Sequence, residues 1–145
     1  MALIDGLADN NKRQKLVTDL TQLLDTQVAS IGGISGMAIK TGYAAINGIS
    51  PGYCAGAIDR LLPESFAALE PIWEEGLKTD NAVGYLTNNS SQTADAVLSV
   101  TDTRIQKSSN STIKGVYSKL RNSVKKHVED SVPGLAKIID EYANN

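Results

Sequence analysis

Cysteine, histidine and aromatic residues are scarce in this sequence of 145 residues. Cys54 is the only cysteine, His127 is the only histidine, and aromatic side chains make up 5% of the chain. A lone cysteine excludes an intramolecular disulfide and a zinc site built from several cysteines, and it favours a reducing compartment such as the cytoplasm. With few aromatic residues the core must consist mainly of Leu, Ile, Val and Ala, a composition that suits helices better than a β-sandwich.

The sequence also lacks a hydrophobic run long enough for a signal peptide or a transmembrane helix. Asp5 and Asp9 precede the first basic residues, and no apolar core of signal-peptide length follows them. The most apolar stretch, residues 31–58, carries Lys40 near the middle of its best window and is interrupted by Ser-Pro at 50–51. Because a charge at that depth in a bilayer needs a special partner, we expect no transmembrane segment and a cytoplasmic protein.

No motif with catalytic or cofactor-binding specificity is present. Residues 48–52, GISPG, match the G-x-S-x-G nucleophile elbow, but that motif requires a preceding strand, and here the flanks are predicted to be helical. The residue before Lys40 and Thr41 is Ile39, so the P-loop pattern fails, and the glycine spacing does not fit a dinucleotide fingerprint. The sequence therefore predicts no catalytic residue, no cofactor and no metal site, and favours a protein that is not an enzyme.

The few reactive side chains have ordinary structural explanations. His127 lies beside the apolar face of its predicted helix and is expected to be partly buried. A thiol–imidazole pair with Cys54 would require the two side chains to meet, and their positions in the sequence do not show that. Glu70, Glu74 and Glu75 are expected to form a solvated acidic edge, since nothing in the sequence buries them.

Apolar residues recur at spacings of three and four along most of the chain, without the sustained alternation typical of strands. We therefore predict an all-α fold, a compact single domain over residues 1–145 with six to eight short helices. Asn10 or Asn11 is expected to cap the first helix, and Ser90 or Ser91 the helix that follows the polar loop. The expected helical segments are residues 10–31, 35–47, 51–62, 63–77, 91–105, 113–128 and 135–142, with a short apolar piece at 82–86.

Prolines are predicted to mark several helix boundaries. Ser-Pro at 50–51 is typical of an N-cap followed by the first helical residue, and Pro63 is expected to restart the chain in the same way. Pro71 should kink or break its helix at Glu70, because proline removes a backbone donor and restricts the residue before it. For the same reason residues 130–133, which end in proline, should break the long amphipathic helix.

Residues 31–58 are rich in glycine, and this enrichment indicates a compensating contact. Glycine inside a helix is less favourable than alanine by about 1 kcal/mol, so several retained glycines indicate close backbone approach. We expect two thin helices that cross closely, either within the domain or across a dimer. The alternative is a small-ligand pocket lined by exposed backbone. The candidate packing or pocket residues are Gly36, Gly42, Tyr43, Gly52 and Gly56.

Charge is unevenly distributed, although the net charge is only −2. Residues 104–126 contain seven basic side chains and no acidic one, whereas residues 59–80 contain six acids and two bases. On a helix, Lys114, Arg121 and Lys125 fall nearly on one line. Such a face can bind an acidic protein partner or an anionic membrane surface, but it is equally typical of a solvated helix face.

The basic segment supplies the candidate anion-binding or partner-binding residues. They are Arg104, Lys114, Lys119, Arg121, Lys125 and Lys126. Nucleic acid is not the expected partner, because aromatic residues suitable for stacking on bases are scarce in this segment. Complementarity between the basic segment and the acidic residues 59–80, within one chain or between subunits, accounts for both runs together.

Four segments carry a resemblance to a known family: GMAIKTGYAAI, LLPESFAALEPIWEE, AVLSVTDTRIQKSSN and TIKGVYSKLRNSVKKHV. In this order they resemble a family of small bacterial proteins of unknown function, found among cyanobacteria and actinobacteria. The resemblance implies a compact helical domain in a bacterial cytoplasm and supplies no catalytic residue, substrate or cofactor. Asp102 and Arg104 fall in its TDTR segment. Because residues two apart do not face each other on one helix, we expect separate partners for them on neighbouring helices.

Two hypotheses of function follow. The first is a non-enzymatic helical interaction protein that self-associates through thin helix faces and presents its basic helix to an acidic partner or an anionic surface. The second is a small-ligand-binding protein or an enzyme with a pocket among the glycine-rich helices of residues 32–58. The first predicts a homo-oligomer whose partner binding depends on Arg121 and Lys125. The second predicts that Gly42→Leu abolishes ligand binding.

Overall fold

The computed structural model describes residues 3–144, except for the side chain of Ser35. These residues form one 3-10 helix and six α-helices, with no strand among them. In chain order the elements are η1 (Leu3–Ala8), α1 (Asn10–Ser30), α2 (Gly33–Asn47), α3 (Tyr53–Leu77), α4 (Ala82–Asn88), α5 (Ser90–Lys107) and α6 (Ser111–Ala143). The predicted all-α fold with six to eight helices is confirmed, and the short apolar piece at 82–86 belongs to α4.

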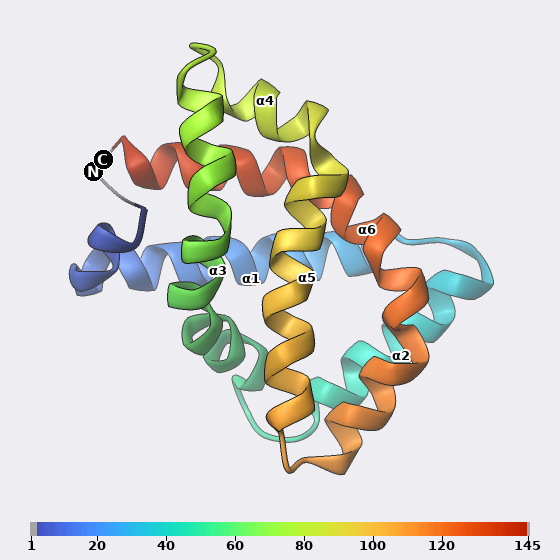
Figure 1. The fold of residues 1–145 in the computed structure, drawn as a ribbon. Coiled ribbons are helices and arrows are strands. Elements are labelled where there is room, and N and C mark those ends of the chain that lie inside the picture. Colours follow the sequence, from blue (N-terminus) through green and yellow to red (C-terminus); the bar gives the residue numbers. More distant parts are fainter. Residues whose placement is uncertain (1–2, 145) are drawn as a thin grey trace.

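The helices cross one another rather than running as a parallel bundle (Figure 1). α3 and α5 lie side by side, α4 connects them at one end, and α1 packs against both α3 and α6. α6 changes direction partway along its length. Its first part packs against α5 on one side and α2 on the other, so α2 lies at the periphery of the molecule. No helix within residues 3–144 combines the length and the apolar character needed to cross a membrane.

The hydrophobic core lies among η1, α1, α3, α4 and the last part of α6. Its buried members are Leu3, Leu7, Leu16, Leu62, Phe66, Leu69, Ile72, Trp73, Ala82, Leu86, Val132, Ala136, Ile139 and Tyr142. Most of these side chains are aliphatic, as the low aromatic content predicts. None of them comes from α2, which therefore depends on other contacts for its position.

The first and last helices meet on the side of the molecule away from α2 (Figure 1). The hydroxyl of Tyr142 donates a buried hydrogen bond to the carbonyl oxygen of Leu3 at 2.7 Å. The Tyr142 ring also packs edge-on against Phe66, with 5.3 Å between ring centroids. An aromatic ring with a satisfied hydroxyl contributes both apolar burial and a directional bond, so this residue fixes both ends of the described chain to the core.

α3 runs without interruption through Pro63 and Pro71, so the predicted restart at Pro63 is wrong, and of the kink or break predicted at Glu70 the break does not occur. A proline inside a helix removes one backbone hydrogen bond and costs about 3 kcal/mol. Burial offsets this cost, because each fully buried large apolar side chain contributes about 1.5–3 kcal/mol. The large side chains that α3 buries in the core are Leu62, Phe66, Leu69, Ile72 and Trp73.

α6 likewise continues through Pro133, so the predicted break at residues 130–133 and the separate final helix are wrong. The two ends of α6 nevertheless run in clearly different directions (Figure 1). A proline ring excludes one backbone bond and bends a helix without ending it, which explains this geometry. We call residues 111–128 the first half of α6 and residues 132–143 its second half.

Two predicted helix caps are wrong by one or two residues. Asp9, not Asn10 or Asn11, caps α1. Its carboxylate accepts hydrogen bonds from the backbone N–H groups of the second and third helical residues, at 3.0 and 3.2 Å. An ionised acceptor at a helix N-terminus also interacts favourably with the helix dipole. At the other site α5 begins at Ser90, and Asn89 holds the cap position without a side-chain cap bond.

The turn between α2 and α3 contains the GISPG motif at residues 48–52. α3 begins at Tyr53 rather than Pro51, so the predicted capping role of Ser50 is wrong. Gly52 stands at the cap position with φ of 70°, a left-handed conformation that glycine adopts without strain. Helices flank the motif on both sides, so the strand that a nucleophile elbow requires is absent from this part of the described chain.

Candidate functional site

Asp102 of α5 binds two side chains of the first half of α6. Its carboxylate accepts hydrogen bonds from Arg121 Nε at 2.8 Å and Nη2 at 3.1 Å, and from the Tyr117 hydroxyl at 2.5 Å. The bonds from Arg121 lower the pKa of Asp102, whereas burial, followed by the bond to Asp102, raises the pKa of Tyr117. Two-pronged, charge-assisted bonds of this kind fix the register of α5 against α6.

Arg104 projects from α5 toward α3. Its Nη2 lies 3.3 Å from Glu64 Oε1 and donates a hydrogen bond to the carbonyl oxygen of Arg60 at 3.2 Å. Asp102 and Arg104 therefore have separate partners on neighbouring helices, which confirms that prediction. The Arg104–Glu64 pair also joins the basic segment 104–126 to the acidic segment 59–80, but the other partners of the basic segment lie elsewhere.

Lys125 has its acidic partner on α5. Its Nζ lies 3.0 Å from Asp95 Oδ1 and 3.9 Å from Glu129 Oε1. Asp95 and Asp102 were not among the expected partners of the basic helix. The sequence did contain a signal for these pairs. Asp95 and Asp102 are seven residues apart and share one helix face, and Arg121 and Lys125 are four apart and share another, so two packed helices can pair them.

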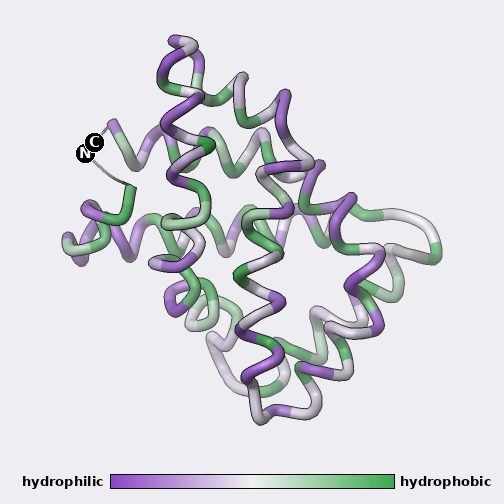
Figure 2. Tube along the Cα trace, viewed as in Figure 1, coloured by the Kyte–Doolittle hydropathy of each residue, from purple (hydrophilic) through white to green (hydrophobic). Residues whose placement is uncertain are grey.

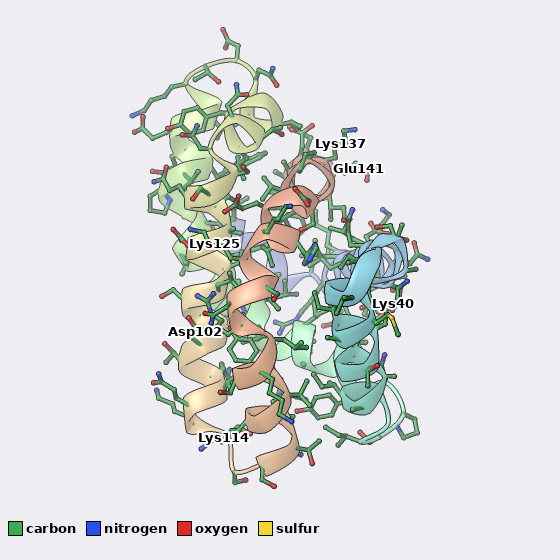
Figure 3. All side chains as sticks on the ribbon, turned by 90° about the vertical axis from the view of Figure 1, so that its right-hand side faces the viewer. Lys40, Asp102, Lys114, Lys125, Lys137 and Glu141 are labelled. Carbon is green, nitrogen blue, oxygen red and sulfur yellow. The ribbon has the colours of Figure 1, made fainter. Side chains whose placement is uncertain are left out.

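The six basic candidates therefore do not form one anion-binding site. Arg104, Arg121 and Lys125 are paired within the chain. The remaining three, Lys114, Lys119 and Lys126, are exposed, and none is within 4.0 Å of an acidic oxygen in residues 3–144. Figure 3 shows Asp102 and Lys125 along the contact of α5 with α6 and Lys114 nearer the loop that joins these helices.

Gly42 is the point where α2 packs closely against α6. A Cβ at this position would lie 2.6 Å from Leu120 Cδ1 and 2.9 Å from Val116 Cγ1, both closer than van der Waals contact. The sequence predicted that a thin helix crosses another helix closely, either within the domain or across a dimer, and the crossing at Gly42 lies within the chain. Its opposing surface consists of branched apolar side chains of α6, not of the second glycine-rich segment.

The other candidates from the glycine-rich stretch have separate environments. A Cβ at Gly36 would meet the backbone of Ile31 just before α2, one at Gly56 would meet an arginine of its own helix, and Gly52 faces open space. Tyr43 donates its hydroxyl hydrogen to the carboxylate of Asp25 on α1. Burial, together with this bond, raises the pKa of Tyr43. Tyr43 thus ties α2 to α1, and these residues do not build one site.

The outward face of α2 is apolar, uncharged and unusually exposed. Its two large side chains are 89% exposed for Ile34 and 70% exposed for Met37, whereas Ile39 and Gly42 on the inward side are buried. Lys40 lies at the edge of this face and is the only charged residue of α2. Figure 2 shows α2 mainly in green and white, and Figure 3 shows Lys40 at the periphery of the molecule. The outward face, as we use the term, comprises Ile34, Met37, Ala38, Thr41, Ala44 and Ala45 together with Gly48, the residue that caps the C-terminus of α2, all exposed.

Two surface depressions lie outside the glycine-rich segment. The larger, about 590 Å³, is open and lies between α1 and α3, with polar lining residues that include Asn10, Gln14 and Thr18. Arg13 and Asp59 cross it as an ion pair of 2.6 Å, so each satisfies the other. The smaller, about 40 Å³, lies between α1 and α6. Neither is lined by residues 32–58, where the ligand-binding hypothesis placed its pocket.

The reactive side chains do not assemble into a centre. Within the described residues, no group of three or more His, Cys, Asp or Glu side chains is arranged to hold a metal ion. Cys54 is buried, and burial raises the pKa of its thiol. His127 is half-buried, as predicted. Glu70 accepts a hydrogen bond from the backbone at the start of η1 at 2.9 Å, so the predicted solvated edge is restricted to Glu74 and Glu75.

These observations define an all-helical protein whose candidate site is an exposed helix face rather than a cleft with reactive side chains. The chain belongs to the family of unknown function DUF6918, whose model matches residues 3–143. The resemblance to a family of unknown function is thereby confirmed over nearly the whole chain. Comparisons with curated proteins and with solved structures give no match.

Proposed function

We propose that this protein is a non-enzymatic interaction protein that self-associates through the outward face of α2. The observation that carries the proposal is the exposure of Ile34 and Met37, 89% and 70%, on a helix face without charge. Apolar surface removed from water contributes about 25 cal/mol per Å². Exposed apolar surface that is contiguous, rather than scattered, is typical of an interaction site.

α2 cannot bury these side chains by rotating in place. Its inward side is fixed by the close contact of Gly42 with Val116 and Leu120, and by the bond from Tyr43 to Asp25. A rotation that buried Met37 would expose Ile39 and separate these contacts. The outward face is therefore a stable surface feature, available to a second molecule.

The size of the face sets the expected strength of association. It extends over the 15 residues from Ile34 to Gly48, whose ends are separated by a rise of roughly 21 Å at about 1.5 Å per residue. A single helix face of this length buries well under the roughly 800 Å² per partner of a standard stable interface. We therefore expect a reversible dimer with a Kd of about 10 μM to 1 mM.

The basic helix has a smaller role in this proposal than the sequence suggested. Lys114, Lys119 and Lys126 are the basic candidates left without an intramolecular ion pair in the described chain, and an acidic partner or an anionic surface would engage these three. The single cysteine fits a reducing compartment, so the proposal places the protein in the cytoplasm.

Sedimentation velocity over a range of about 5 μM to 1 mM tests the proposal. The wild type should sediment as a concentration-dependent mixture of monomer and dimer. Met37→Asp should remain monomeric over the same range, because dimerisation would then bury an unpaired carboxylate. Leu77→Asp is the matched control, since Leu77 is 55% exposed on α3 and lies outside the outward face.

The control separates a specific surface from general stickiness. Leu77→Asp should dimerise like the wild type. A wild type that stays monomeric at the highest concentration contradicts the proposal, and so does a loss of dimer in Leu77→Asp equal to that in Met37→Asp.

A further inference from the structure

We infer that two copies of α2 pack antiparallel through their outward faces, about a two-fold axis that passes next to Thr41. This inference rests on the proposed self-association and adds the identity of the partner surface and its register. The inference states which residues of the two copies meet, whereas the proposed function states only that the outward face binds a second copy.

Side-chain size is unevenly distributed along the outward face. The large members, Ile34 and Met37, lie at its N-terminal end, and Ala44, Ala45 and Gly48 make its C-terminal end thin. A parallel pair would oppose large side chains to large ones at one end and leave a gap between thin surfaces at the other. Poorly filled gaps forfeit dispersion contacts, so that arrangement is unfavourable.

An antiparallel pair gives complementary shapes along the whole contact. Positions equally distant from Thr41 then face each other, so Ile34 meets Gly48 of the second copy and Met37 meets Ala45. Large side chains are placed on thin backbone at both ends, and two copies of the same face complete each other, as a closed two-fold interface requires. The Thr41 hydroxyl donates to the Met37 carbonyl at 2.9 Å, so the residue at the axis brings no unsatisfied donor.

Charge also favours a second copy as the occupant. The outward face itself carries no charged side chain, so two copies of it can meet without burying a charge, and Lys40 stays at its edge. An acidic or basic partner, by contrast, would find no opposite charge there. Antiparallel helices further place the positive end of one helix dipole beside the negative end of the other.

Lys40 gives the antiparallel arrangement an electrostatic signature. A two-fold axis perpendicular to both helices keeps the same flank of each copy on one side of the interface, so the two Lys40 side chains lie near each other. In a parallel pair they lie on opposite flanks. Mixing wild type with Lys40→Glu should therefore favour the mixed dimer over either homodimer by about 1.5- to 5-fold at low salt, and this preference should fade with added salt.

Disulfide trapping tests the register directly. Two variants of a Cys54→Ala chain each carry one new cysteine, Thr41→Cys or Ile34→Cys. Glutathione disulfide is added to each variant at a protein concentration where the wild type dimerises. In a dimer of Thr41→Cys chains the two new cysteines lie at the axis and fit the roughly 4.4–6.8 Å Cα separation of a disulfide. In an antiparallel dimer of Ile34→Cys chains they stand about 21 Å apart along the helices and cannot be bridged. The expected result is at least about tenfold faster cross-linking of Thr41→Cys than of Ile34→Cys.

The outcomes separate this inference from the proposed function. Equal or faster cross-linking of Ile34→Cys overturns the antiparallel register, and so does the absence of cross-linking in both variants while sedimentation still shows a dimer. Loss of the wild-type dimer itself overturns the proposed function as well. Circular dichroism checks that each variant is folded. If Cys54→Ala unfolds the chain, the same pair is compared with Cys54 retained, because burial and a raised thiol pKa slow its reaction.

Discussion

The two halves of α6 are parts of one helix, but they are held by different kinds of contact. In the second half Val132, Ala136 and Ile139 are fully buried in the hydrophobic core. In the first half Ile113 is the only buried residue among those described, and the helix is positioned by the Asp102–Arg121 pair and by close packing on Gly42. The difference teaches that stability is concentrated on one side of the molecule, whereas the other side, which carries α2, is specified by polar pairs and shape.

The largest expected effect comes from truncating the core side. Ile139→Ala should lower the free energy of unfolding by about 4 kcal/mol, because it leaves a cavity in fully packed surroundings. Ile113→Ala, the same change in the first half, should cost about 2 kcal/mol, since the edge of the molecule relaxes around the lost volume. Urea unfolding followed by circular dichroism measures both. Equal losses would break the comparison between the two halves.

A second prediction sharpens the role of shape in the first half. Gly42→Ala should destabilise the protein by about 1–2 kcal/mol, because the added methyl group collides with Leu120 and Val116 and the strain exceeds the gain in helix propensity. Gly115→Ala is the matched control on α6, where an added Cβ meets no atom within 4 Å. It should stabilise the protein by about 0.5–1 kcal/mol. Urea unfolding followed by circular dichroism measures both changes in stability. If Gly42→Ala stabilised the protein, α2 would not be closely packed on α6.

The smallest effect concerns the polar pair and depends on pH. Asp102→Asn should cost about 1 kcal/mol at neutral pH, a modest value because both charged side chains are about one-third exposed. The pKa of Asp102 is lowered in the folded state, so its stabilising effect is present above the ordinary Asp pKa of about 3.9. It is lost as pH falls below that value and through the lowered pKa. The gap in stability between wild type and variant, measured by urea unfolding at each pH, should therefore close on acidification.

Lys125→Gln provides a comparison for this prediction. Its ion pair with Asp95 is made by one nitrogen and is more exposed, and its distance to Glu129 is long at 3.9 Å, so the substitution should change stability by about 0.5 kcal/mol or less. If Asp102→Asn were as mild as Lys125→Gln at neutral pH, the two-pronged bond from Arg121 would not be what fixes the first half of α6.

The sequence predicted those parts of the fold that depend on short-range pattern. The apolar spacing of α1 and of the first half of α6 located both helices, and the two-residue separation of Asp102 and Arg104 correctly implied separate partners. The predicted helix breaks at prolines failed. A rule based on neighbouring residues gives the cost of a proline inside a helix, but it does not include the burial of Phe66 and Trp73, which offsets that cost.

The candidate site was only half visible in the sequence. The thin character of α2 could be read from its glycines and alanines, but which side faces outward depends on where α6 and α1 lie. The partners of Arg121 and Lys125 were hidden for the same reason, since Asp102 and Asp95 approach them only after α5 and α6 pack.

The bond between Tyr142 and Leu3 makes the described chain nearly a closed ring. A circularly permuted chain, with Leu3 and Asn144 joined by a short linker and new ends opened in the turn at residues 48–52, would keep the seven described helices intact. η1 and the end of α6 lie on the side away from α2 (Figure 1). Labels attached beside η1 or beside the end of α6 would therefore leave the outward face free, and such labels can report on α2 without covering it.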